Sequence, residues 1–387
     1  MNIINDDKNK EISKILNISF NQDNSCFSLG TEKGFMIFQT YPIKNHFERE
    51  MDGGIKIAEM YYRTNLLALI GGGDIPKFNP KKLVMWDDYQ NKMISEIKFF
   101  SILKKVKLNN DKIFAICERN IYVFDIKTFE SLEIIETKDN PKGLFGISNE
   151  LKKLVIAYPQ RVDKDSKETT NKTSILIKNY NKNTTVKITT QEDIISYISL
   201  NNDGSLLAYS NEKGTIIRIH SCINSNLLSE FYRGKEKAEI NYICFDKLNN
   251  YLAVTSDRGT IHIWSMSSVI DKLKDLKNKD DINDNENEPE TLEEEKIKID
   301  DKNENKIIEE NSNEKEILPR NKKAMFGNTE KSFAQIRINS NKSICSFQKN
   351  NIIVVVTYDG MYYQAQLDKN GGNCKIIFQD SLNNLKK

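Results

Sequence analysis

Short apolar runs, each followed by a polar turn, recur along almost the whole chain. Most of them have the length of one strand, contain β-branched or aromatic residues, and are followed by a second run after the turn. Representative runs cover 66–70, 113–116, 154–157, 206–208, 251–254 and 352–356. Long helical periodicity is confined to one region. The pattern predicts an all-β fold.

Several of these strand pairs also resemble one another. The segments 203–220 (DGSLLAYSNEKGTIIRIH) and 248–264 (LNNYLAVTSDRGTIHIW) align so that their turn glycines, Gly214 and Gly259, are 45 residues apart (259 − 214). A repeat of about 40–45 residues with four strands per unit is typical of WD-type propellers. One four-stranded sheet cannot bury both of its faces, so such units stack around an axis. Weaker copies of the repeat cover 23–39 and 351–364.

The repeats predict one seven-bladed β-propeller over residues 1–387. The seven predicted units span 15–50, 53–98, 100–137, 141–190, 192–234, 238–340 and 342–380. The three glycines at 71–73 are followed by neither Lys-Ser nor Lys-Thr, so we interpret them as a turn and not as a phosphate-binding loop.

The sixth unit is too long because it contains a highly charged insertion at 267–331. The insertion is rich in Asp and Glu and has few aromatic residues, and such a composition cannot bury enough surface to fold alone. We therefore expect a mostly disordered loop within blade six. Its first part, 269–276, has apolar residues at helical spacing with lysines opposite them. A membrane-surface helix, a solvated helix and no helix remain open for this part.

Composition excludes several classes of function. The net charge is only +2, whereas a nucleic-acid-binding protein usually has a clear basic excess, so no nucleic-acid partner is expected. No apolar run approaches the roughly 18 residues that span a bilayer, and the first ten residues predict no secretory signal. The six cysteines form no C-x-x-C pair and the three histidines are scattered, so we expect no metal, no cofactor and buried thiols in a reducing cytosol.

Residues 231–234 read Phe-Tyr-Arg-Gly and are followed by Ala-Glu-Ile at 238–240. This stretch resembles the hallmark of the PROPPIN family, which is Phe-Arg-Arg-Gly followed by a similar segment. Further stretches resemble the family in the same order, so the resemblance covers almost the whole chain. These stretches cover 20–38, 80–87, 120–137, 140–148, 332–338, 342–347 and 371–375.

The resemblance implies a function as well as a fold. It implies a non-enzymatic, monomeric adaptor that binds phosphatidylinositol 3-phosphate, the 3,5-bisphosphate or both, and acts in autophagy-related membrane recruitment or in vesicle and organelle trafficking. Such an adaptor works from the cytoplasm on phagophore, endosomal or vacuolar membranes, or on a plastid in an organism that has one. Autophagy-related protein partners would bind loops of the early blades, here 71–82 or the edge of blade three. The headgroup preference stays open.

The family has two lipid-headgroup pockets, at the rims of blades five and six, and each arginine of the motif faces one of them. On the blade-six side we expect Arg233 to clamp a ring phosphate, Ser256 and Thr260 to donate hydroxyl hydrogens, His262 to add a donor, and Arg258 to help from the turn. Without the motif, these Ser and Thr residues would be interpreted as turn caps and the histidine as a core residue. The predicted lipid-binding residues of this pocket are Arg233, Gly234, Thr255, Ser256, Arg258, Gly259, Thr260 and His262.

The blade-five pocket departs from the family pattern. Tyr232 stands in place of the first arginine, Gln191 in place of a histidine and Asn211 in place of a serine. A lost guanidinium removes a charge-assisted hydrogen bond worth roughly 1.5–3 kcal/mol, so this pocket should be weak or should depend on Arg218. The predicted residues are Gln191, Asn211, Gly214, Thr215, Arg218, Tyr232 and Lys237.

The far end of the insertion is a candidate membrane contact. The centre of the insertion is acidic and would be repelled by anionic lipid, whereas 319–326 combines basic charge with large apolar side chains. The candidate contact residues are Lys322, Lys323, Met325 and Phe326.

Two other functions compete with lipid binding. A WD-type propeller scaffold that binds only proteins has the same fold, and the fold cannot distinguish the two. A propeller enzyme would need carboxylates or histidines that converge on the central channel, and the sequence offers no paired motif for this.

Overall fold

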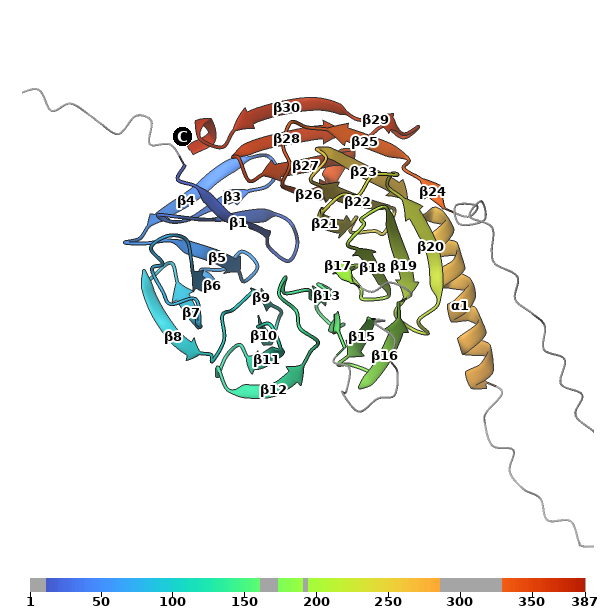
Figure 1. Cartoon of the computed structure of the whole chain (residues 1–387), viewed down its shortest axis with the longest axis horizontal. Coiled ribbons are helices and arrows are strands. Elements are labelled where there is room, and N and C mark those ends of the chain that lie inside the picture. Colours follow the sequence, from blue (N-terminus) through green and yellow to red (C-terminus); the bar gives the residue numbers. More distant parts are fainter. Residues whose placement is uncertain (1–11, 161–172, 191–193, 286–328, 387) are drawn as a thin grey trace, which may run out of the picture.

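In the computed structural model, residues 12–160, 173–190, 194–285 and 329–386 are described. Their strands form seven separate sheets arranged in a ring around a central axis (Figure 1). The predicted seven-bladed all-β propeller is confirmed. Each predicted unit contains at least the first three strands of one blade. Most of these strands are about six residues long and are joined by short turns.

The first four blades are four-stranded. Blade one consists of β1 (Ile15–Phe20), β2 (Cys26–Thr31), β3 (Gly34–Gln39) and β4 (Lys44–Glu50). Blade two consists of β5 (Ile55–Met60), β6 (Leu66–Gly71), β7 (Lys82–Asp87) and β8 (Lys92–Lys98). Blade three consists of β9 (Lys105–Leu108), β10 (Lys112–Ile116), β11 (Asn120–Asp125) and β12 (Ser131–Glu136). Blade four consists of β13 (Gly146–Ile147), β14 (Val155–Pro159), β15 (Ser174–Asn179) and β16 (Thr184–Thr189).

Blades five and six each have an additional short strand. Blade five consists of β17 (Ile195–Leu200), β18 (Leu206–Asn211), β19 (Ile216–Ser221), β20 (Leu227–Tyr232) and β24 (Glu330–Lys331). Blade six consists of β21 (Ile240–Phe245), β22 (Tyr251–Ser256), β23 (Thr260–Ser265), β25 (Ala334–Arg337) and β29 (Gly372–Asn373). Blade seven consists of β26 (Ser343–Gln348), β27 (Ile352–Thr357), β28 (Met361–Gln366) and β30 (Lys375–Ser381), and two 3₁₀ turns lie at Lys349–Asn351 and Asn384–Lys386.

The ring closes by packing between blades one and seven, because each of these blades is built from its own stretch of chain. The hydroxyl of Tyr362 in blade seven donates to the backbone oxygen of Thr40 in blade one at 2.7 Å. The rings of Tyr362 and Phe27 stack with 6.5 Å between their centroids. One buried apolar cluster lies at each of the seven contacts between neighbouring blades. The blades are therefore held to one another by apolar side chains that alternate along the strands.

The two turn glycines that revealed the repeat have the backbone conformation the sequence predicts. Gly214 and Gly259 have φ angles of +59° and +67°, in the left-handed region that side chains disfavour. A Cβ on Gly214 would also lie 2.1 Å from the backbone oxygen of Ala238. Both turns therefore require glycine.

The beginning of the insertion is ordered into a helix, which was one of the alternatives that the sequence left open for this part. Helix α1 (Ser267–Asn285) follows β23 and lies along the outside of β20 in blade five (Figure 1). Val269 and Leu273, four residues apart, are buried in the cluster that joins blades five and six. The ammonium group of Lys272 donates to the backbone oxygen of Leu228 at 2.7 Å.

The helical spacing at 269–276 is therefore real, but its apolar side packs on the propeller. The membrane-surface alternative for this part is not supported, because its buried apolar residues have no surface left to offer a bilayer. The last two residues of the insertion form β24, which pairs in parallel with the edge of β20. Residues 286–328, with the predicted membrane contacts Lys322, Lys323, Met325 and Phe326, lie outside the described residues.

Candidate functional site

One face of blade six is turned toward blade five, and the candidate site is built on it. Ile261 and Ile263 in β23 belong to the core shared with blade seven, so Thr260 and His262, which alternate with them, lie on the opposite face. Trp264, two residues after His262, stacks on Phe231 of blade five with 5.4 Å between the ring centroids. Thr260 and His262 therefore face blade five.

Arg233 approaches this face from blade five, directly after the end of β20. Its Nε donates to the backbone oxygen of Gly214 at 2.5 Å, and its Nη2 donates to the backbone oxygen of Glu236. The side chain is buried, at 8% exposure, and forms no ion pair with any described carboxylate. These two bonds use two of the five guanidinium N–H donors. The other three N–H donors are not bonded to any described residue, and the charges of Asp257 and Glu236 act on the guanidinium only without forming an ion pair with it.

Burial and nearby positive charges lower the pKa of two side chains at this point, His262 and Arg233. Burial and the positive charge of Arg233 lower the pKa of His262 from 6.5 to about 4, so its imidazole is neutral at physiological pH. Burial lowers the pKa of Arg233, and the nearby charge of Arg258 lowers it further. The lowered pKa values of His262 and Arg233 indicate a positive potential at this point, which a bound anion would relieve.

Ser256 lies on the same face as His262. It follows Val254 by two residues, and Val254 pairs with His262 in the neighbouring strand. Its hydroxyl is buried and has no hydrogen-bond partner within the described part of the chain. An unsatisfied buried hydroxyl costs about 1–3 kcal/mol, so such a group calls for an explanation. A ligand oxygen at this position would satisfy it.

Other predicted residues of the blade-six pocket have structural partners. Thr255 lies on the opposite face, where its hydroxyl donates to the backbone oxygen of Ser343 at 2.6 Å, and we assign it to the contact between blades six and seven rather than to ligand binding. Arg258 donates to the backbone oxygen of Lys237 at 2.8 Å and lies 3.6 Å from the carboxylate of Glu236. These contacts of Arg258 stabilise the position of the loop that follows Arg233.

The remaining predictions for this pocket concern backbone positions and one ring nitrogen. Gly259 supplies the positive-φ turn described above, and a Cβ on Gly234 would meet no atom within 4 Å. The Nδ1 atom of His262 lies 3.3 Å from the hydroxyl oxygen of Ser332. The structure thus brings together Arg233, Ser256, Arg258, Thr260 and His262, and this group is called the blade-six site below.

On the corresponding face of blade five, the arginine is paired with a carboxylate. Arg218 lies on the side turned toward blade four, because its neighbours Ile217 and Ile219 pack against blade six. Its Nε donates to the Oε1 atom of Glu230 at 2.8 Å. The guanidinium that should compensate for Tyr232 is therefore already matched to a carboxylate of its own blade.

The other predicted residues of the blade-five pocket have turn and backbone roles. The side-chain oxygen of Asn211 accepts a hydrogen bond from the backbone N–H of Gly214 at 3.1 Å. The backbone oxygen of Thr215 accepts one from the backbone N–H of Arg233 at 2.8 Å. The side chain of Lys237 is exposed, and Gln191 lies outside the described residues. Sequence reasoning missed Glu230, since only the pairing of β19 with β20 shows that it is opposite Arg218.

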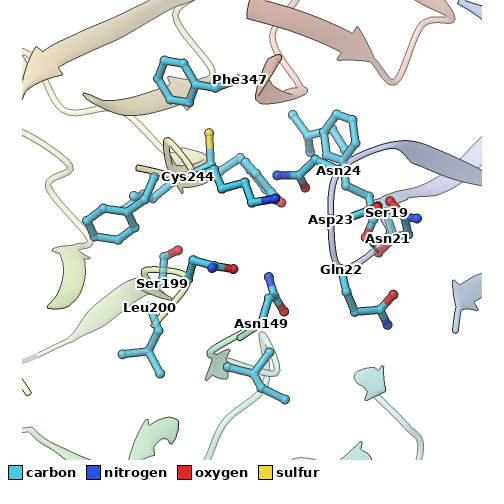
Figure 2. A pocket seen from close by; sticks show the side chains of 18 of the residues that line it. Ser19, Asn21, Gln22, Asp23, Asn24, Asn149, Ser199, Leu200, Cys244 and Phe347 are labelled. Atoms are coloured by element: carbon cyan, nitrogen blue, oxygen red, sulfur yellow. Dashed lines mark hydrogen bonds between the residues drawn. The ribbon is translucent and has the colours of Figure 1, made fainter. Parts of the chain in front are cut away.

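A cavity of about 1750 Å³ lies in the centre of the ring. Figure 2 shows its polar lining, with Asn21, Asn24 and Asn149 projecting into it beside the apolar Phe347. The buried carboxylate of Glu59, also in the lining, is bound by Lys107 at 2.8 Å and by Ser19 at 2.6 Å. Within the described segments no three His, Cys, Asp or Glu side chains are grouped so that they could hold a metal ion. Among the helices of those segments, none has the length and apolarity needed to cross a bilayer.

Fold and site together define a seven-bladed propeller with a basic site between two neighbouring blades. Residues 14–278 match the model of the PROPPIN family. Autophagy-related protein 18e of Arabidopsis thaliana is 30% identical over 370 residues, which cover 95% of this chain and 87% of that protein. SVP1-like protein 2 of Candida glabrata is 31% identical over 291 residues, which cover 68% of this chain and 65% of that protein. The chain belongs to the PROPPIN family.

Solved structures agree in fold. Hsv2p of Kluyveromyces lactis has a TM-score of 0.68 at 19% identity, with 96% of this chain and 99% of that chain covered. KlAtg21, solved in complex with the coiled coil of AgAtg16, has a TM-score of 0.68 at 22% identity, with 95% and 99% covered. PROPPIN proteins are non-enzymatic autophagy adaptors, and this chain is an Atg18-like autophagy protein.

Proposed function

We propose that the chain binds a phosphoinositide headgroup, phosphatidylinositol 3-phosphate or the 3,5-bisphosphate, at the blade-six site. Binding recruits it from the cytoplasm to phagophore, endosomal or vacuolar membranes as a peripheral adaptor. The observation that carries this proposal is the state of Arg233, which is buried, is hydrogen-bonded only to backbone oxygens and forms no ion pair with a described carboxylate. A buried guanidinium without a counter-ion favours an anion beside it.

The neighbouring groups fit a phosphate better than a carboxylate or a cation. A phosphate has several acceptor oxygens, and the site offers the guanidinium of Arg233, the unsatisfied hydroxyl of Ser256, and the hydroxyl of Thr260 on the same face. His262 adds a ring nitrogen that becomes cationic when an anion raises its pKa from about 4. No bond is made or broken, so the site needs neither a nucleophile nor a general base.

Only one of the two family pockets contributes strongly in this proposal. Arg218 in the blade-five pocket is paired with Glu230, and Tyr232 supplies no positive charge there. A phosphate would have to displace an internal carboxylate to reach that guanidinium. We therefore propose one strong headgroup site per chain, with membrane avidity supplied by 319–326 of the insertion through Lys322, Lys323, Met325 and Phe326.

The adaptor role also needs a protein partner, and the early blades offer exposed apolar side chains. Ile75 lies in the 71–82 loop, and Leu132 and Ile134 project from β12 at the edge of blade three. KlAtg21 was solved with a coiled coil bound, and we propose that an autophagy-related protein binds this chain on its early blades. A scaffold that binds proteins only would use the same surface, and lipid binding distinguishes the two.

Vesicle flotation tests the proposal. Purified protein is mixed with vesicles that contain either phosphoinositide, and with vesicles that contain only unphosphorylated phosphatidylinositol. We expect co-flotation with the phosphorylated lipids and not with the control. Absence of binding to all three, or equal binding to all three, would leave only the protein scaffold.

A further inference from the structure

Arg337 lies at the end of β25, beside the blade-six site. In the strand pairing it is directly opposite Thr260, while Gln335 is opposite His262. Its neighbour Ile336 is buried in the core with blade seven, so Arg337 projects to the face turned toward blade five. Thr260, His262 and Arg337 therefore share one face.

The side chain of Arg337 is exposed and unpaired. No hydrogen bond, ion pair or ring contact involves its guanidinium within the described segments. The other rim arginine, Arg258, is held by the Lys237 carbonyl and by the carboxylate of Glu236. Arg337 is thus the freer of these two exposed guanidinium groups.

The two blades repeat this arrangement position by position. In blade five, Arg218 is opposite Glu230 and Ile216 is opposite Tyr232. In blade six, His262 is opposite Gln335 and Thr260 is opposite Arg337. Arg337 consequently has the place in blade six that Tyr232 has in blade five, which is the place of the first arginine in the Phe-Arg-Arg-Gly motif.

The two blades also differ at the next position along this face of the outer strand. Glu230 neutralises the guanidinium of Arg218 in blade five, whereas its counterpart in blade six is the neutral amide Gln335. A guanidinium on this face of blade six therefore has no carboxylate from the adjacent strand to compete with a ligand. Blade six therefore has a guanidinium, that of Arg337, at the position of Tyr232, and a neutral amide at the position of Glu230.

We propose that Arg337 is a second guanidinium of the blade-six site and selects a headgroup with two ring phosphates over a headgroup with one. This inference rests on the proposed function. The buried Arg233 holds one phosphate between the blades, and Arg337 reaches a second phosphate from the rim with its long side chain. An arginine fork binds a phosphate through two parallel hydrogen bonds, so its contribution depends on that phosphate being present.

The test compares two lipids and two variants. Vesicles with the 3,5-bisphosphate and vesicles with the 3-phosphate are titrated with wild type, Arg337→Ala and Arg119→Ala. Arg119, paired with Asp139 on blade three, is a matched control for loss of one exposed arginine. We expect Arg337→Ala to weaken binding to the bisphosphate roughly tenfold or more and binding to the monophosphate less than threefold. Arg119→Ala should leave both affinities unchanged.

The outcomes separate this inference from the function on which it rests. Equal losses for both lipids would overturn it, since they would show only general attraction to an anionic surface, and so would no loss for either lipid. In both cases a wild type that still binds leaves the proposed function standing. If wild type binds neither lipid, both are overturned. Soluble inositol 1,3,5-trisphosphate, tested with the same variants, shows whether the discrimination belongs to the headgroup alone.

Discussion

Arg218 and Glu230 form an ion pair on the side of blade five that faces blade four, with 2.8 Å between Nε and Oε1. The corresponding pair in blade six is His262 and Gln335, which has no carboxylate. Two pockets that the fold repeats therefore differ in charge. In blade five a carboxylate pairs with the guanidinium, as a bound phosphate would. In blade six no carboxylate stands at the equivalent position, so the positive charge of this site can attract an anionic ligand.

The first prediction concerns the blade-five pocket. Glu230→Gln should release Arg218 and allow a second headgroup to bind, because the amide no longer neutralises the guanidinium. Calorimetry with soluble inositol 1,3-bisphosphate should then approach two headgroups per chain instead of one, and vesicle affinity should rise severalfold through avidity.

Glu133→Gln is the control for this change, because Glu133 also forms an ion pair within the propeller, with Lys178, but lies away from both pockets. It should not change the number of headgroups bound. A stoichiometry of one in Glu230→Gln, and also in Glu230→Gln combined with Tyr232→Arg, would show that the ion pair is not what disables the pocket.

The second prediction concerns pH. Because the pKa of His262 is lowered from 6.5 to about 4 in the folded protein, the unfolded chain binds more protons between these values. The free energy of unfolding should therefore fall as pH falls through this window and stop responding to His262 below it. A bound phosphate raises the pKa of His262, so protonation of His262 should strengthen lipid binding as the pH falls toward 4.

His262→Gln should remove both effects. The titration of the lipid phosphate and of His220, whose pKa burial also lowers, is common to wild type and variant, so the difference between them reports on His262. Vesicle binding at pH 7.5, 6 and 5 provides the comparison. Parallel pH profiles in the two proteins would exclude His262 from the site.

The third prediction concerns Ser256. Its buried hydroxyl has no partner among the described residues, so Ser256→Ala should not lower the free energy of unfolding and should weaken headgroup binding by roughly threefold to tenfold. Thr255→Val is the contrasting variant, because the Thr255 hydroxyl is bonded to Ser343 and its loss should cost stability without a direct effect on binding. Calorimetric unfolding and vesicle titration measure the two effects. A stability loss in Ser256→Ala with unchanged binding would assign Ser256 a structural role.

The fourth prediction concerns helix α1. Leu273 is buried against blade five, so Leu273→Ala should lower the free energy of unfolding by about 2–5 kcal/mol. Vesicle binding by the folded protein should be unchanged. Lys274→Ala, at the exposed neighbouring position, should alter neither property. Weaker vesicle binding by Leu273→Ala at unchanged stability would restore the membrane-surface interpretation of this helix.

Much of the fold was predictable because the propeller repeats its strands at a fixed period. The turn glycines Gly214 and Gly259 lie in equivalent turns of neighbouring blades, so the number of residues between them is the period of the repeat. The helix at 269–276 was visible as a spacing, but its partner was not. Burial of Val269 and Leu273 depends on an outer strand of blade five, and sequence reasoning had no means of placing the insertion over that strand.

The site was predictable to the extent that one motif marks it. The motif placed Arg233 beside His262, and the structure shows their electrostatic interaction. The counter-ions could not be predicted, since Glu230 and Gln335 acquire their meaning only through register with β19 and β23. Thr255 and Ser256 are adjacent in sequence, and only the alternation of the strand shows that one faces blade seven and the other blade five.

The affinity of Arg233→Ala for vesicles containing phosphatidylinositol 3-phosphate tests the central claim most directly. Thermal unfolding of the same protein controls for the two lost bonds to the Gly214 and Glu236 carbonyls. We predict at least a tenfold loss of affinity in a variant that remains folded, against no change in Arg119→Ala. A folded Arg233→Ala that binds these vesicles as tightly as wild type would contradict the assignment of a headgroup to the blade-six site.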